Sequence, residues 1–162
     1  MRSLFALILF FFVINHAKAE LLVTTPSQAC ALLDETGLVT NGWKNEYDQE
    51  FACSSEYKQI GSGFPLANNL AFYVEGNNNS IALAYLMLNI NDKTSASSAH
   101  QELLKAAKIL SNKQTGKQLS PKLIDAITKG SNTSQKIGNA MVDIVRKDWP
   151  TGRGYEVKVT IK

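Results

Sequence analysis

Apolar and polar residues alternate without a break over residues 155–162. This pattern is typical of a β-strand with one buried face. Residues 69–76 and 80–91 are also predicted strands, because both are rich in apolar residues and the three asparagines between them suit a hairpin turn. The second of these strands is apolar on both faces, so we expect a central strand that is covered on both sides or nearly so.

Two further segments alternate less regularly. Residues 45–54 place three acidic side chains on one face and Cys53 on the other, and residues 137–149 also have one apolar face. Each segment is predicted to form a single strand. Cys53 is then expected to face the core.

Three segments have the features of helices. Residues 25–37 begin with Thr-Pro, which suits a first helical turn, and end on a glycine. Residues 94–113 repeat Leu and Ala at helical spacing, with lysines on the outer side. Residues 120–130 begin with Ser-Pro and end on a glycine. The predicted order is therefore α-β-β-β-α-α-β-β, an α+β fold with an antiparallel sheet of about five strands and three helices.

The first 19 residues resemble a secretory signal peptide. Arg2 precedes an apolar run of 11 residues, and Ala17-Lys18-Ala19 fits the small-x-small cleavage pattern. The alternative is a retained membrane anchor. Eleven helical residues cover only about 17 Å, which is short of the ~30 Å hydrocarbon core. We expect cleavage after Ala19, a single periplasmic or secreted domain over residues 20–162, and no integral membrane segment after cleavage.

The chain has two cysteines, Cys30 and Cys53. In an exported protein such a pair predicts a disulfide bond. The alternative, a catalytic cysteine, needs a general base, and His100 is the one histidine that follows the predicted signal peptide. We expect the disulfide.

Charge narrows the classes of partner. Without residues 1–19 the chain carries 15 basic and 14 acidic residues, which argues against a nucleic-acid-binding protein. The charges are nevertheless unevenly placed, with 2 basic and 8 acidic residues over 20–91 and 13 and 6 over 92–162. The two halves either attract each other within the fold or leave a basic face for an anionic surface or an acidic partner.

Candidate chemistry is sparse in this sequence. His100 lies in a helical segment, and the chain has no Gly-x-Ser-x-Gly motif for a serine nucleophile. A zinc site would need three or four suitable ligands, and Glu46, Asp48 and Glu50 form no calcium loop. We expect no catalytic residue, no metal and no cofactor. A carboxylate pair that cleaves a polymer of the cell envelope stays an alternative.

The segment Asp148–Val159, DWPTGRGYEVKV, allows two interpretations. It lacks the spacing of a phosphate-binding loop, and a predicted strand follows it where that loop needs a helix. Pro150 and two glycines favour a hairpin turn instead. A turn would present Arg153 beside Trp149 and Tyr155, a suitable place for a partner contact.

These patterns indicate an exported protein that works by binding. We expect the partner to be a protein, and an acidic protein is one possibility. One specific version of this role is an inhibitor or immunity protein. A small envelope-polymer hydrolase and a structural or assembly accessory of the envelope are the alternatives. The residues expected to bind are Trp149, Arg153, Tyr155, Lys105 and Lys108.

Overall fold

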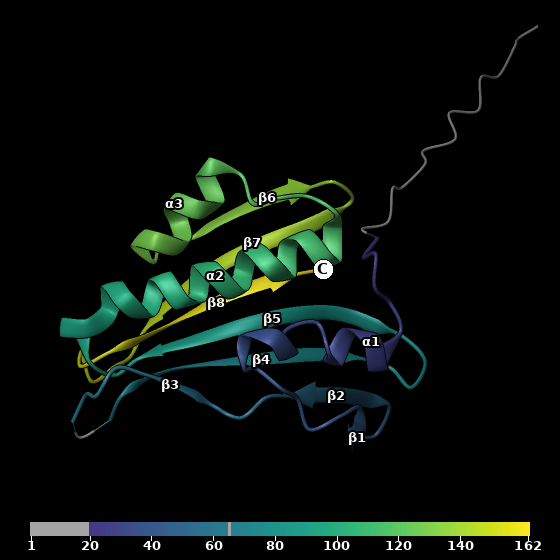
Figure 1. Ribbon diagram of the computed structural model, residues 1–162, viewed down its shortest axis with the longest axis horizontal. Helices are drawn as coiled ribbons and strands as arrows, with labels where there is room; N and C mark the ends of the chain where they lie inside the picture. Colours follow the sequence, from purple (N-terminus) through teal and green to yellow (C-terminus); the bar gives the residue numbers. More distant parts are fainter. Residues whose placement is uncertain (1–19, 65) are drawn as a thin grey trace, which may run out of the picture.

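The computed structural model describes residues 20–64 and 66–162; the predicted signal peptide lies outside them. The described residues form an α+β fold around one antiparallel sheet of eight strands (Figure 1). The strands are β1 (Lys44–Tyr47), β2 (Glu50–Ser54), β3 (Lys58–Ile60), β4 (Asn68–Gly76), β5 (Ile81–Ile90), β6 (Thr133–Ile137), β7 (Ala140–Asp148) and β8 (Tyr155–Ile161). The predicted fold class is confirmed, although the sheet has more strands than the five or so expected.

The order of strands across the sheet differs from their order in the sequence. It runs β1-β2-β4-β5-β8-β7-β6, and β3 pairs with β4 beyond the end of β2. β8 therefore lies between β5 and β7, although it follows both in the chain. β1 and β6 lie at the two ends of this order, and β3, which pairs only with β4, is a further edge strand.

The helices form a second layer on one face of the sheet (Figure 1). α1 (Pro26–Cys30) and α2 (Ala96–Thr115) both contact β4 and β5, and α3 (Pro121–Lys129) contacts β6 and β7. The core lies between the two layers. Its fully buried side chains include Phe72 from β4, Leu103 from α2 and Ile127 from α3, each with no exposed surface.

The boundaries of α3 follow its predicted capping residues, whereas α2 extends to Thr115, two residues beyond the predicted end. Ser120 accepts a hydrogen bond from the backbone N–H of Leu123 at the start of α3, and Gly130 ends the helix in the left-handed conformation. α2 ends in the same way at Gly116. The first predicted helix is wrong in extent, because residues 25–37 contain only the five residues of α1 and a 3₁₀ turn, η1 (Asp34–Thr36).

One predicted single strand is a hairpin, and another pairs with a strand that was not predicted. Residues 45–54 turn back after Tyr47, where Asp48 takes a left-handed φ of 48°, so that β1 pairs with β2. Residues 137–149 contain the single predicted strand, β7, and a turn at Gly138, where φ is 58°, joins it to the unpredicted β6. β3 was not predicted. These elements account for the additional strands.

The other face of the sheet has no helix of the described residues packed on it. Tyr73 of β4 stacks on Tyr85 of β5 with ring centroids 4.8 Å apart, and the Nζ atom of Lys158 lies 3.6 Å from the centroid of the Tyr85 ring. These contacts leave only 7% of Tyr85 exposed. The prediction that β5 is central is confirmed. Its second face, however, is covered by neighbouring side chains rather than by another layer.

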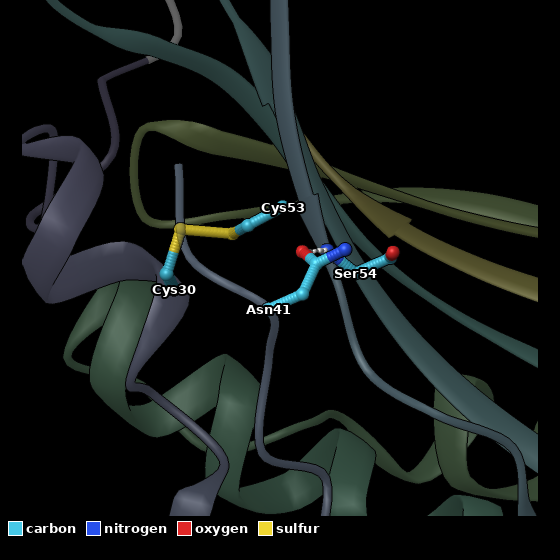
Figure 2. Close-up of a disulfide and its surroundings, with 4 residues drawn as sticks. All are labelled: Cys30, Asn41, Cys53 and Ser54. Atoms are coloured by element: carbon cyan, nitrogen blue, oxygen red, sulfur yellow. Dashed lines mark hydrogen bonds between the residues drawn. A yellow bond between two sulfur atoms is a disulfide. The ribbon is translucent and has the colours of Figure 1, made fainter. Parts of the chain in front are cut away.

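The predicted disulfide is present. Cys30 at the end of α1 is bonded to Cys53 of β2, as Figure 2 shows, and both residues are buried. Next to it Asn41 accepts a hydrogen bond from the backbone N–H of Ser54 at 3.1 Å. The backbone N–H of Asn41 also donates to the carbonyl of Ser54, and that of Ile81 to the carbonyl of Thr24. The N-terminal segment is therefore tied to the sheet by one covalent bond and several hydrogen bonds.

Candidate binding groove

A groove runs along α2 on the helical side of the molecule. Its larger hollow, of about 600 Å³, lies between η1, α2 and the start of α3. A second hollow of about 310 Å³ lies between η1, β3 and α2. Glu35 and Ile109 line both hollows, so the two lie next to each other along α2, and we treat them as one candidate groove. We call it the α2 groove.

The floor of the α2 groove is apolar. Leu119, Ile109 and Ile124 line the larger hollow, and Leu38, Leu70 and Ala106 line the smaller one. Ala106 and Ile109 come from α2, Ile124 from α3 and Leu70 from β4, while Leu38 and Leu119 lie in the loops that follow η1 and α2. The helical spacing of Ala106 and Ile109 brings both to the same side of α2. Leu38, Leu70, Ala106 and Leu119 are already buried by the fold, whereas Ile109 and Ile124 are half-buried. The apolar surface that a partner can still cover therefore comes mainly from these two isoleucines, and covering it is favourable.

One rim of the groove is η1, which is held in place by buried residues on both sides. Leu33 precedes it and Leu38 follows it, each with no exposed surface. Gly37 closes the turn with a φ of +79°, a conformation that a residue with a Cβ adopts at a cost. The disulfide anchors the preceding helix. Glu35 is therefore presented from a fixed backbone.

Lys113 connects the two sides of the larger hollow. Its Nζ atom donates to both carboxylate oxygens of Glu35, at 2.7 and 2.8 Å, and to the backbone carbonyl of Leu32 at 2.8 Å. The hydrogen bond from Lys113 holds the pKa of Glu35 below its ordinary value. This pair joins an acidic residue of the first half of the chain to a basic residue of the second half.

In the smaller hollow, Glu102 is the carboxylate that pairs with lysines. Lys105 donates to one of its carboxylate oxygens at 2.8 Å and Lys58 to the other at 3.2 Å. The hydrogen bond from Lys105, with that from Lys58, lowers the pKa of Glu102. Both lysines are thus partly neutralised.

Lys108 stands at the larger hollow without such a partner. It is exposed, and within the described part of the chain no carboxylate forms an ion pair with it. The α2 groove as a whole has four lysines, Lys58, Lys105, Lys108 and Lys113, and two glutamates. Its charge is therefore positive, and Lys105 and Lys108 lie together in it as two of the residues predicted to bind.

The other predicted binding residues lie elsewhere, at the β7–β8 loop. The backbone N–H of Trp149 donates to the carbonyl of Gly154 at 3.0 Å and that of Gly152 to the carbonyl of Trp149 at 2.8 Å, so the predicted hairpin turn is confirmed. Arg153 is exposed in the turn and Trp149 is half-buried. The structure does not bring these residues to the α2 groove.

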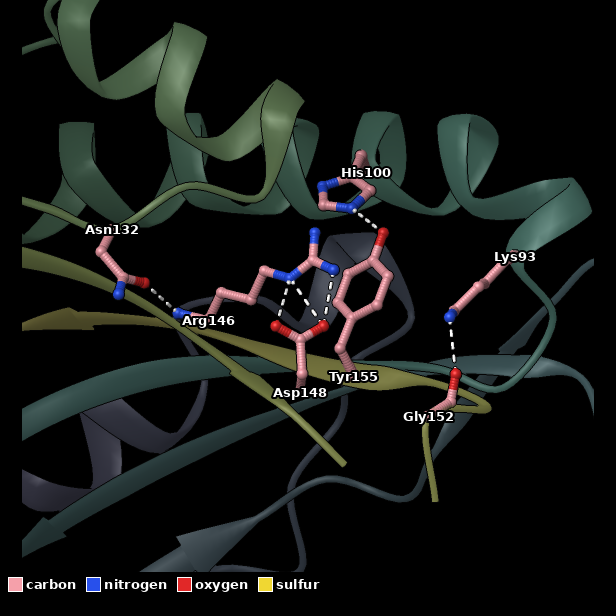
Figure 3. A network of polar contacts seen from close by, with 7 residues as sticks. All are labelled: Lys93, His100, Asn132, Arg146, Asp148, Gly152 and Tyr155. Carbon is pink, nitrogen blue, oxygen red and sulfur yellow. Dashed lines mark hydrogen bonds and ion pairs between the residues drawn. The ribbon is translucent and has the colours of Figure 1, made fainter. Parts of the chain in front are cut away.

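Tyr155 is a core residue rather than a surface residue. Only 7% of it is exposed, and its hydroxyl group hydrogen-bonds to His100, as Figure 3 shows. The guanidinium of Arg146 lies 3.7 Å from the centroid of its ring and pairs with Asp148. Tyr155 faces the helices because alternate residues of a strand point to opposite faces of the sheet. Its expected contact with a partner is therefore corrected.

Sequence reasoning found the lysines of α2 but not the rest of the groove. Glu35, Lys58 and Glu102 are far apart in the chain, and no local pattern predicts that they meet. The only relevant feature of the sequence is the acidic first half and basic second half, which the pair Glu35–Lys113 joins in the fold.

Residues 20–64 and 66–162 contain no group of three or more His, Cys, Asp or Glu side chains placed to hold a metal ion. Within the same ranges, no helix combines the length and the apolar character needed to cross a bilayer.

Residues 19–148 match DUF6030, a family of unknown function. The chain belongs to the DUF6030 family. The match starts at the last residue of the predicted signal peptide and includes the whole α2 groove, but it stops before the β7–β8 loop and β8. No curated protein and no solved structure matches this DUF6030 member significantly.

Proposed function

We propose that this protein is an exported, non-enzymatic binding protein whose α2 groove holds an acidic segment of a partner protein. The observation that carries the proposal is an apolar floor beneath a lysine rim in which Lys108 has no ion-pair partner among the described residues. A segment with an apolar anchor and a nearby carboxylate would cover the floor and supply that missing partner.

Two further observations support this role. The intramolecular disulfide is typical of proteins outside the reducing cytosol, which agrees with the predicted signal peptide. Both ring nitrogens of His100 are engaged within the core, by the carbonyl of Ile127 and the hydroxyl of Tyr155, so this histidine serves packing. Inhibition of a partner enzyme is one form of the role, since a bound surface segment can obstruct the partner's own site.

The first test identifies the partner. A photo-cross-linking amino acid replaces Asn112, an exposed residue that lines the larger hollow, in the full chain expressed in its own cells. The same amino acid placed at Lys136, exposed on the edge strand β6, serves as the control. A protein captured from position 112 and not from position 136 is the expected result. Equal capture from both positions contradicts a specific groove.

The second test measures affinity for the purified partner. Lys108→Glu reverses the charge of a lysine in the groove, and Lys136→Glu makes the same change at an exposed lysine of the sheet. We expect Lys108→Glu to weaken binding about tenfold, with a smaller loss at high salt, and Lys136→Glu to leave it unchanged. Unchanged affinity in Lys108→Glu overturns the proposal.

A further inference from the structure

One end of the molecule carries two strongly exposed apolar side chains. Phe64 is 97% exposed and Leu66 is 58% exposed, both in the loop between β3 and β4. A side chain as large as Phe at this exposure leaves almost its whole ring in water. Nothing in the α2 groove accounts for these two residues.

Three segments meet at this end. Asn91 donates to the carbonyl of Ala67 at 2.8 Å, which ties the β3–β4 loop to the end of β5. The Nζ atom of Lys93 donates to the carbonyl of Gly152 at 2.7 Å, which ties η2 (Lys93–Ser95) to the β7–β8 loop (Figure 3). We call the surface formed by residues 61–64, 66–67, 93–95 and 149–154 the loop end.

The net charge at the loop end is positive. Lys93 and Arg153 are exposed there. Asp148 is paired with Arg146. Asp92 keeps its negative charge, because its hydrogen bonds come from the uncharged groups of Thr94 and Ser95. Two cations and one carboxylate therefore flank an apolar tip.

We propose that the loop end docks on an anionic lipid bilayer. Phe64 and Leu66 would enter the boundary between headgroups and acyl chains. Lys93 and Arg153 would contact lipid phosphates. Proteins that lie on membranes combine apolar insertion and electrostatic attraction in this way. The tip protrudes rather than forming a hollow. A bilayer can receive it without a matching pocket, whereas a protein partner must supply one.

This orientation leaves the α2 groove accessible. α2 starts at the loop end, and Ile109 lies thirteen residues along the helix, about 20 Å from its start. A molecule docked through the loop end would hold the groove away from the bilayer. The inference does not depend on the proposed function, because vesicle binding can be measured without a protein partner.

The test is co-sedimentation of the protein, without residues 1–19, with vesicles. We expect binding to phosphatidylcholine vesicles that contain about 30 mol % phosphatidylglycerol, little binding to phosphatidylcholine alone, and weakening by salt. Phe64→Ala should reduce binding about tenfold or more, because the ring supplies most of the inserted apolar area. Tyr47→Ala, at another exposed aromatic residue on β1, should leave it unchanged.

Two further variants separate the contribution of charge from that of the inserted aromatic ring. Arg153→Glu should weaken binding to the anionic vesicles only. Phe64→Trp should keep binding and add a blue-shifted fluorescence component when vesicles are present. Wild-type protein that does not sediment with anionic vesicles overturns the proposal, as does equal binding by Phe64→Ala. A Phe64-dependent protein contact without vesicle binding would also overturn it and assign the loop end to a protein.

Discussion

The Nε2 atom of His100 on α2 lies 3.0 Å from the hydroxyl oxygen of Tyr155 on β8, in a site where only 4% of the histidine is exposed. The Nδ1 atom lies 2.6 Å from the carbonyl oxygen of Ile127, so Nδ1 carries the proton and donates it. Nε2 then accepts from Tyr155. The pair joins the helical layer to the sheet, and it depends on a neutral imidazole.

Burial lowers the pKa of His100, and the nearby charge of Arg146 lowers it further, against an opposing effect of the hydrogen bond to Ile127. In the unfolded chain His100 takes up a proton near pH 6.5, whereas the folded protein does so at a lower pH. The unfolded state therefore binds more protons as the pH falls below 6.5. We expect the free energy of unfolding to decrease from that pH downward, by up to about 1.4 kcal/mol per pH unit, until the folded histidine is also protonated.

Urea unfolding between about pH 5 and 7.5 measures this slope, above the range in which most carboxylates titrate. His100→Gln is the matched variant, since it lacks the titrating group. It should be less stable than wild type at neutral pH, with a flatter dependence on pH. Parallel curves for the two proteins would contradict the assignment.

The disulfide should contribute substantially to stability. Cys30 and Cys53 are 23 residues apart, and closing a loop of this length is worth about 3.5 kcal/mol in the chain-entropy model. We expect Cys30→Ser combined with Cys53→Ser to lower the melting temperature by on the order of 10 °C. Calorimetry tests this. The oxidised protein should also weigh about 2 Da less than its reduced form, and free thiols detected by alkylation would contradict the bond.

The hydroxyl group of Ser120 should stabilise the start of α3. Its hydroxyl accepts from the backbone N–H of Leu123 and donates to the side chain of Gln135 at 2.6 Å. Ser120→Ala should cost about 1 kcal/mol in the free energy of unfolding, as the loss of a helix cap usually does. Ser97→Ala, at an exposed site on α2, should change it by less than about 0.5 kcal/mol. Denaturant titration compares the two.

The two glycines of the β7–β8 loop should differ in their tolerance of a side chain. A Cβ at Gly154 would collide with the carbonyl oxygen of Ile90 and lie 2.5 Å from the Trp149 ring, so Gly154→Ala should cost on the order of 2–3 kcal/mol. Gly152 has open space around it and a φ of +67°. Gly152→Ala should cost only about 1 kcal/mol. Thermal melts of both variants test the difference, and an equal loss would contradict it.

The sequence predicts the elements whose pattern is local. β4, β5 and β8 have long apolar runs or strict alternation, and α3 carries its own capping residues. The missed strands lack such patterns. β3 has three residues, and β6 reads Thr-Ser-Gln-Lys-Ile with one apolar residue. The turn between β1 and β2 contains no glycine that would have predicted it. Asp48 adopts the left-handed conformation there instead.

The α2 groove could be predicted only in part. The exposed lysines follow from the helical spacing of α2, since Lys105 and Lys108 fall on its outer side. The pair of Lys105 with Glu102 is local to α2, at a spacing of three residues. The partner of Lys113 is Glu35 of η1, whose position depends on tertiary packing. Tyr155 shows the same limit. Its place next to a turn favoured a surface role, but the pairing of β8 with β5 and β7 directs its ring under α2.

The central position of β8 has a consequence for folding during synthesis. The ribosome makes β1–β5 and β6–β7 before residues 155–161, yet these two groups of strands join only through β8. Until that last strand emerges, β5 and β7 each keep an unpaired edge, and the sequence-distant pairing of β5 with β8 makes closure a late step. The sheet of such a chain stays incomplete until synthesis is nearly finished.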